Sequence, residues 1–306
     1  MTLNARVGLW CVAILVFLGG MGSPIAPTAA EEAKTYQLRY HFVAGQEWHY
    51  VSQTDSEFTV QFQQAKDTVP HTSMFLRHVT VLKANPDGSA EVELLLDKAR
   101  MTAENAGVSS LYDSEDPEHV PTEFTNVHAS LGLPRRAFIS AQGKVHVDSE
   151  KAVSELLIQL PDTPVAVGAT WKEKTEVSIQ VDDDSKLQRV VQLQRRYELK
   201  SVENGIATIG VTTACLSPIN NPYQESMLIQ RKPSGVLKFD IGRGCLVDRQ
   251  LVIDDQVVGN QGPGSALSVK QVKVDRLIGA DQLEQVDLTK PLVPVRVAAA
   301  PVKSVQ

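Results

Sequence analysis

Apolar and polar side chains alternate along most of this chain, so that apolar residues recur two positions apart. A period of two is typical of a β-strand with one buried face and one wet face, and it favours antiparallel over buried parallel sheet. The sequence therefore predicts a mainly β fold. The alternating apolar positions are Leu38, Tyr40 and Phe42; Phe75, Val79 and Val81; Ala90, Val92, Leu94 and Leu96; Val177, Ile179 and Val181; Val191 and Leu193; Ala207, Ile209 and Val211; Leu237, Phe239 and Ile241; and Val247, Leu251, Ile253 and Val257.

Three short elements occur twice, in the same order. A Gly-x-x-Trp element ends at Trp48 and again at Trp171, and each is followed by a tight turn and then by a second glycine turn. The equivalent glycines are 123, 117 and 101 residues apart, a drift that loop insertions produce; they are Gly45 and Gly168, Gly88 and Gly205, and Gly143 and Gly244. We therefore expect two related antiparallel, curved β-sheet units, each like half of a barrel.

The first unit is predicted at residues 31–154 and the second at residues 155–288, with a short connecting helix at about 149–160. Asp148 or Ser149 can cap this helix, an apolar stripe follows, and Pro161 ends it. A second candidate helix covers residues 122–131. Prolines interrupt residues 289–306, which we expect to be an extended or disordered tail.

Residues 1–30 have the three parts of a secretory signal peptide: a cation at Arg6, an apolar run and small residues ending at Ala30. The apolar run is about 15 residues long, shorter than the ~20 that a spanning helix needs. We therefore expect an exported protein, periplasmic or at the cell surface, with no stable membrane span after cleavage. Cys11 lies inside the apolar run, where it is a poor lipidation site.

The formal net charge is −6, and the charged residues are dispersed without a basic stripe. Nucleic acid and anionic membrane surfaces are therefore not expected as partners. After signal cleavage the chain keeps two cysteines, Cys215 and Cys245. In an oxidising compartment they form either one disulfide, which closes a loop of about 30 residues, or two buried free thiols.

Motifs for chemistry are scarce. The sequence has no nucleophile elbow, no phosphate-binding glycine loop and no metal-binding spacing of histidines, so we expect no catalytic residue, no cofactor and no metal ligand. A zinc or copper site assembled from distant strands is the alternative to a scatter of structural histidines. The seven histidines are His41, His49, His71, His78, His119, His128 and His146.

Trp48, Trp171 and Phe42 are the candidate ligand-facing residues. As ligand-facing aromatics, the two tryptophans would mark two equivalent binding sites for carbohydrate or lipid. As core residues of the repeat, they would pack each sheet against its helix. The glycine three residues before each tryptophan favours the structural role, because a tight bend with an aromatic folded over it is a packing device.

Three segments resemble a domain-of-unknown-function family of exported planctomycete proteins. They are residues 40–50, residues 160–171 and residues 235–241, which carry turn and packing signatures. The likeness would cover about residues 36–278. It implies export and a duplicated β-rich body, with no known activity and no catalytic residues to carry over.

These observations predict an exported, non-enzymatic envelope protein that binds a lipid or another apolar ligand on a concave sheet face. An envelope or polysaccharide hydrolase with carboxylates in a cleft between the units is one alternative, and a structural cell-surface component is another. An apolar cavity of several hundred Å³ supports the carrier. Two carboxylates ~5–9 Å apart in an open groove support glycoside hydrolysis.

Overall fold

The computed structural model describes residues 34–105, 107–145, 156–182 and 187–292. The predicted signal peptide, residues 149–155 of the predicted connecting helix and residues 293–306 of the predicted tail lie outside this described part of the chain.

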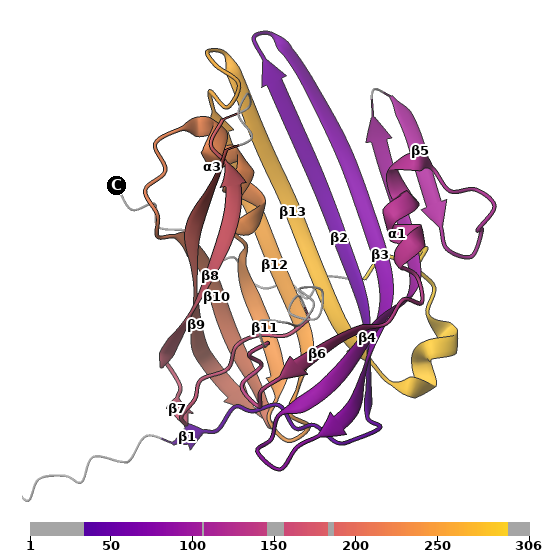
Figure 1. Ribbon diagram of the computed structural model, residues 1–306, viewed down its shortest axis with the longest axis vertical. Coiled ribbons are helices and arrows are strands. Elements are labelled where there is room, and N and C mark those ends of the chain that lie inside the picture. The colour runs from indigo at the N-terminus through magenta and orange to yellow at the C-terminus, as the bar shows by residue number, and fades with distance from the viewer. Residues whose placement is uncertain (1–33, 106, 146–155, 183–186, 293–306) are drawn as a thin grey trace, which may run out of the picture. The chain divides into compact units, whose positions relative to one another are not determined.

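Eleven strands form a single antiparallel sheet, which confirms the mainly β, antiparallel fold (Figure 1). Its hydrogen-bonded order is β5-β4-β3-β2-β13-β12-β11-β10-β9-β8, and β6 pairs with β4. The strands are β2 (Glu47–Phe62), β3 (Ala65–Ala84), β4 (Ala90–Asn105), β5 (Val108–Asp113), β6 (Arg135–Ile139), β8 (Thr170–Gln180), β9 (Gln188–Glu203), β10 (Ile206–Cys215), β11 (Ser234–Asp240), β12 (Cys245–Val258) and β13 (Ser265–Ile278).

The strands of the two predicted units belong to this one sheet, because β2 pairs with β13 from Phe62 opposite Ser265 to His49 opposite Ile278. Two further short strands, β1 (Thr35–Tyr36) and β7 (Val165–Ala166), pair separately. Within the described residues β5 and β8 are not paired with each other, so the sheet is not closed.

The element order is similar in the two halves. In the first, β2, β3 and β4 are followed by α1 (Thr125–Ser130) and by β6, which pairs back onto β4. In the second, β8, β9 and β10 are followed by α3 (Pro222–Leu228) and by β11, which pairs back onto β10. Among the described residues, the β4–β5 hairpin has no counterpart after β10.

The sheet is strongly curved, as the position of α3 requires. Asn221 caps this helix by accepting a hydrogen bond from the Tyr223 amide, and Pro222 occupies its first turn. The helix packs against both β8 and β12. β8 and β12 are separated by four strand spacings, so their axes would be ~19 Å apart in a flat sheet. A helix is only about 10–12 Å wide and could not contact both strands there. The sheet must therefore curl around α3.

The helix predicted at 122–131 is present as a 3₁₀ turn, η1 (Thr122–Phe124), followed by α1. The predicted connecting helix is wrong over residues 156–160, which are a turn and irregular chain. Other segments bind its backbone there: the Ile158 amide donates to Tyr40 Oη at 3.0 Å, and the Leu160 amide donates to the Gln142 carbonyl. Its apolar side chains still enter the core, which explains the apolar stripe.

Residues 37–43 alternate in burial as predicted but form no strand. They run extended across two glycine turns: the Tyr40 amide donates to the Ala141 carbonyl, and the His41 amide donates to the Gly244 carbonyl. The main hydrophobic core collects side chains from the same end of the strands, including Trp48, Tyr197 and Phe239. This core fills one end of the curved sheet.

Cys215 and Cys245 are free thiols, so the disulfide alternative is not realised in the structure. Cys245 on β12 pairs with Asp240 on β11, which pairs with Ile206 on β10. Cys215 lies nine residues further along β10, ~30 Å at the rise of a strand, whereas a disulfide requires Cα atoms within ~7 Å.

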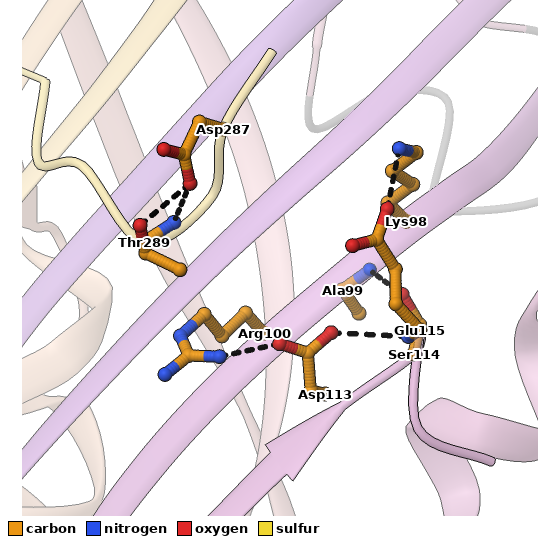
Figure 2. Close-up of polar contacts among 8 residues, drawn as sticks. All are labelled: Lys98, Ala99, Arg100, Asp113, Ser114, Glu115, Asp287 and Thr289. Atoms are coloured by element: carbon orange, nitrogen blue, oxygen red, sulfur yellow. Dashed lines mark hydrogen bonds and ion pairs between the residues drawn. The ribbon is translucent and has the colours of Figure 1, made fainter.

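Ion pairs and a covering segment stabilise the outer face around β2 to β5. Arg100 pairs with Asp113, and Lys98 pairs with Glu115 at 2.6 Å, across the β4–β5 hairpin (Figure 2). From η3 (Ala280–Gln285) onward, the chain packs against a patch formed by Val51, Met74 and Leu76. The packing side chains are Leu283, Val286, Leu288 and Leu292. Asp287 accepts hydrogen bonds from Thr289 (Figure 2), so residues 289–292, predicted as tail, form a turn that contacts the sheet.

Candidate functional site

A cavity of about 680 Å³ lies on the inner face of the curved sheet. Its walls come from β8, β9, β10, β12 and β13, from the segments 143–145 and 157–159, and from residues 230–233 after α3. This volume is within the 300–1,000 Å³ range of small-molecule sites. The cavity is therefore the candidate functional site.

Apolar side chains form a large part of this cavity. The inner faces of the strands supply them because the alternation places every second residue on that side. Leu157 and Ile158 add to them from the segment that was predicted as helix. The apolar lining consists of Val145, Leu157, Ile158, Val177, Leu193, Val211, Leu251 and Ile253.

A polar cluster lies at the β8–β9 side of the cavity. Glu173 and Arg195 are directly opposed across the two strands, with 3.6 Å between the guanidinium and the carboxylate. The hydroxyl of Tyr197 donates to Glu173 at 2.7 Å. Burial, then the neighbouring Glu173 carboxylate, raise the pKa of Tyr197, so its hydroxyl stays protonated and remains a donor.

A second polar cluster crosses β12, β13 and β2 and is almost fully buried. Arg249 contacts Asp275 at 2.7 Å, and the Ser52 hydroxyl donates to Asp275 at 2.6 Å. Burial opposes ionisation of Asp275, but the Arg249 guanidinium, with help from Lys273 and Ser52, outweighs it and lowers the pKa of the carboxyl group. The pair is therefore charged at neutral pH.

Cations outnumber carboxylates around the cavity. Arg195 is matched by Glu173, Arg249 by Asp275, and Lys144 by Asp162 at 3.8 Å. In all, six cationic side chains line the cavity against two carboxylates, Glu173 and Glu176. The cations are Lys144, Lys174, Arg195, Arg231, Arg249 and Lys273. The cavity is thus amphipathic, with an apolar wall and a surplus of positive charge.

The aromatic candidates from the sequence lie in the core. Trp48 is buried and contacts Tyr40 and Phe42, with ring centroids 6.4 and 5.6 Å away. Trp171 is partly buried, stacks on Tyr197 and donates its indole N–H to the Gln159 carbonyl at 2.7 Å. All three candidates pack in one cluster, and Tyr197 is the aromatic residue that lines the cavity.

The charged cavity residues were not predicted from the sequence. Three of them lie at positions where the two-residue alternation predicts an inward-facing apolar side chain: Arg195, Arg249 and Lys273. A charged residue at such a position could have indicated a polar site on the inner face. Arg249, for example, precedes Leu251 and Ile253 at the same two-residue spacing. The histidines were predicted to be scattered, but His49 and His78 lie together on the outer face.

No protein-family model and no curated protein matches the chain. Among solved structures, DynF from the dynemicin biosynthesis pathway of Micromonospora chersina is 8% identical, covering 87% of this chain and 96% of that one, with a TM-score of 0.22. The translocator domain of the autotransporter NalP from Neisseria meningitidis is 8% identical, covering 77% and 89%, with a TM-score of 0.26. Such low TM-scores support no conclusion about fold or function.

Among the described residues, no helix has both the length and the apolar character that crossing a membrane requires.

Proposed function

We propose that this chain is an exported, non-enzymatic envelope protein that holds an amphipathic, lipid-like ligand with an anionic group. The inner-face cavity carries this proposal. Its volume of about 680 Å³ suits a single acyl-chain ligand better than a macromolecule. Its wall combines apolar strand residues with a surplus of cations.

The division of apolar and charged side chains within the cavity supports an amphipathic ligand. Apolar side chains such as Leu193, Leu251 and Ile253 offer contact area for a hydrocarbon chain. Arg231 and Lys273 attract an anionic head group. Because cationic side chains outnumber carboxylates along the cavity lining, a carboxylate or phosphate amphiphile fits better than a neutral lipid.

The hydrolase alternative has less support. Paired-carboxylate hydrolysis needs two carboxyl groups facing one substrate. Glu173 lines the cavity but is engaged by Tyr197 and Arg195. Glu176 also borders the cavity, but it is three residues further along β8 and therefore projects from the opposite side of the strand to Glu173. There it accepts a hydrogen bond from Gln192.

Export and duplication belong to the same proposal. The sequence of residues 1–30 supports export, to the periplasm or to the cell surface. The matching order of strands and helices in the two halves, with an equivalent glycine turn between β3 and β4 and between β9 and β10, supports descent from a duplicated unit.

Calorimetric titration of the purified protein with oleate and with the uncharged oleyl alcohol tests the proposal. We expect saturable binding of oleate with one molecule per chain, and weaker binding of the alcohol. Leu251→Gln should weaken oleate binding about tenfold, because it places a polar group on the apolar wall. The matched control is Val252→Gln, a change at the next, outward-facing and exposed residue of β12. Equal effects of the two changes, or no saturable binding, would refute the proposal.

A further inference from the structure

Strands β2 and β3 are neighbours in the sheet (Figure 1). His49 on β2 and His78 on β3 are directly opposed across them. Their ring centroids are 5.4 Å apart. Opposed residues in an antiparallel pair have Cβ atoms about 4.5–5.5 Å apart, so both rings project from the same face. This is the outer face, because the inner face at this level is formed by Trp48 and Val79. The two imidazoles thus converge at a place separate from the cavity.

A β-bulge adds a carboxylate to the pair. On β4, Lys98 pairs with Leu76 of β3 and Leu96 pairs with Arg77, which leaves Asp97 as the extra residue between them. Bulges redirect side chains in this way. Asp97 reaches His78, with both carboxylate oxygens 2.8 Å from Nδ1. Three neighbouring strands therefore supply His49, His78 and Asp97 to one point.

A second carboxylate lies beside the first histidine. Glu47 is two residues before His49 on the same strand and hence on the same face. Its Oε2 atom is 3.1 Å from Nε2 of His49. One ligand atom from each of His49, His78 and Asp97 lies within 4.8 Å of the others. Two ligands of a tetrahedral zinc ion are about 3.3 Å apart, so small side-chain rotations would bring all three into coordination.

We propose that His49, His78 and Asp97, with Glu47 as a fourth donor, bind a divalent transition-metal ion of the zinc type. Two imidazoles with carboxylates are a donor set that suits Zn²⁺. The histidine side chains are 12% and 19% exposed, partly shielded from water yet open to an entering ion. Strands hold all four donors, so little ordering would oppose binding.

A purely structural role predicts the same hydrogen bonds without a metal. His119 provides the comparison, because it also contacts a carboxylate, that of Asp116 at 3.1 Å. Its side chain is 78% exposed and it belongs to no group of three convergent donors among the described residues. A histidine–carboxylate contact alone should therefore bind no metal there.

The experiment uses the protein purified without a histidine tag and stripped of metal with a chelator. Zn²⁺ binding is measured by equilibrium dialysis with elemental analysis, and the coordination is read from the visible absorption of the Co²⁺-substituted protein. We expect one ion per chain and the absorption bands of a tetrahedral or five-coordinate site. His49→Ala and His78→Ala should each abolish both signals, and His119→Ala should leave them unchanged.

Asp97→Asn keeps the shape of the side chain, so this variant should fold even if the alanine variants do not. It should weaken Zn²⁺ binding at least about tenfold while leaving the far-ultraviolet circular dichroism unchanged. The proposal is overturned if the unaltered protein binds no stoichiometric Zn²⁺. It is also overturned if binding survives in the His49 and His78 variants. Oleate binding in the cavity is measured separately, and the outcome of the zinc experiment does not decide whether oleate binds.

Discussion

Asp275 and Arg249 form an ion pair that is almost completely removed from water, with side chains 1% and 6% exposed. Two charges in such a place depend on each other, because either one alone would be buried without compensation. The Ser52 hydroxyl supplies a further hydrogen bond to the carboxylate. This pair connects β12, β13 and β2, at the junction of the two halves of the sheet.

Asp275→Asn should therefore lower the free energy of unfolding by about 3–5 kcal/mol, because it leaves the Arg249 charge buried and unpaired. Denaturant-induced unfolding measures the change. Glu115→Gln is the matched control: it breaks the exposed Lys98–Glu115 pair on the β4–β5 hairpin (Figure 2) and should cost less than about 1 kcal/mol. Equal losses in the two variants would contradict the role assigned to the buried pair.

His71 lies on the inner face near Phe124, with ring centroids 6.4 Å apart, and burial lowers its pKa. At a pH below the unfolded-state pKa of about 6.5 the unfolded chain binds the proton and the folded chain resists it, so stability falls as the pH drops from 6.5 towards the folded-state pKa. His71→Gln should remove part of this dependence. Unfolding midpoints at pH 5 and pH 7.5 test it, with the exposed His119→Gln as control. An unchanged difference between the two pH values in the His71 variant would be evidence against it.

The glycine turns are the elements whose chemistry is most tightly constrained. Gly143 has a φ of +78°, and a Cβ atom there would lie 2.3 Å from the Ile158 carbonyl oxygen. Gly205 has nearly the same φ, +79°, but a Cβ atom there would meet nothing within 4 Å. The two turns therefore separate the effect of backbone conformation from that of close packing.

Gly205→Ala should cost about 1 kcal/mol, the strain of a positive φ alone. Gly143→Ala should cost clearly more, because the 156–160 segment must also move away from the turn. Thermal and denaturant unfolding of both variants measure the difference. Equal costs would mean that the segment has no fixed position against the turn.

Much of the sheet could be predicted from the sequence, because period-two alternation reports directly on which side of a strand is buried. The strands around Ile209 and Leu237 follow the pattern closely. The connecting helix could not be predicted correctly over residues 156–160, because an apolar stripe fits an irregular segment buried by Tyr40 and Gln142 equally well. Helix α3 was not predicted, although Asn221 and Pro222 form a usual helix start.

The candidate site was predicted less well than the fold. The sequence gives no sign of which strands become neighbours, so the opposition of His49 and His78 and the convergence on the cavity depend on pairing that only the structure shows. Trp48 and Trp171 were recognised as packing residues or ligand contacts, and both lie in the main core cluster. The charged residues of the cavity occupy positions where the alternation predicts inward-facing side chains, so the sequence could have indicated them. Asp97, in contrast, reaches His78 through a β-bulge that no residue pattern predicts.

For the molecule as a whole, the inner face of one curved sheet has two distinct regions. One end of its inner face is filled by the main core, and the cavity occupies a region between that core and α3. Filling the whole inner face with side chains would stabilise the sheet further. The open amphipathic cavity therefore lowers the stability of the fold, and the proposed ligand-binding role would account for its presence.

The most direct test is native mass spectrometry of the protein purified gently from its own cells. We expect a reproducible excess mass over the bare chain, released by organic extraction and identified as an acyl-chain amphiphile with an anionic group. A mass that matches the bare chain would contradict the proposed binding role, provided that the protein also fails to bind oleate.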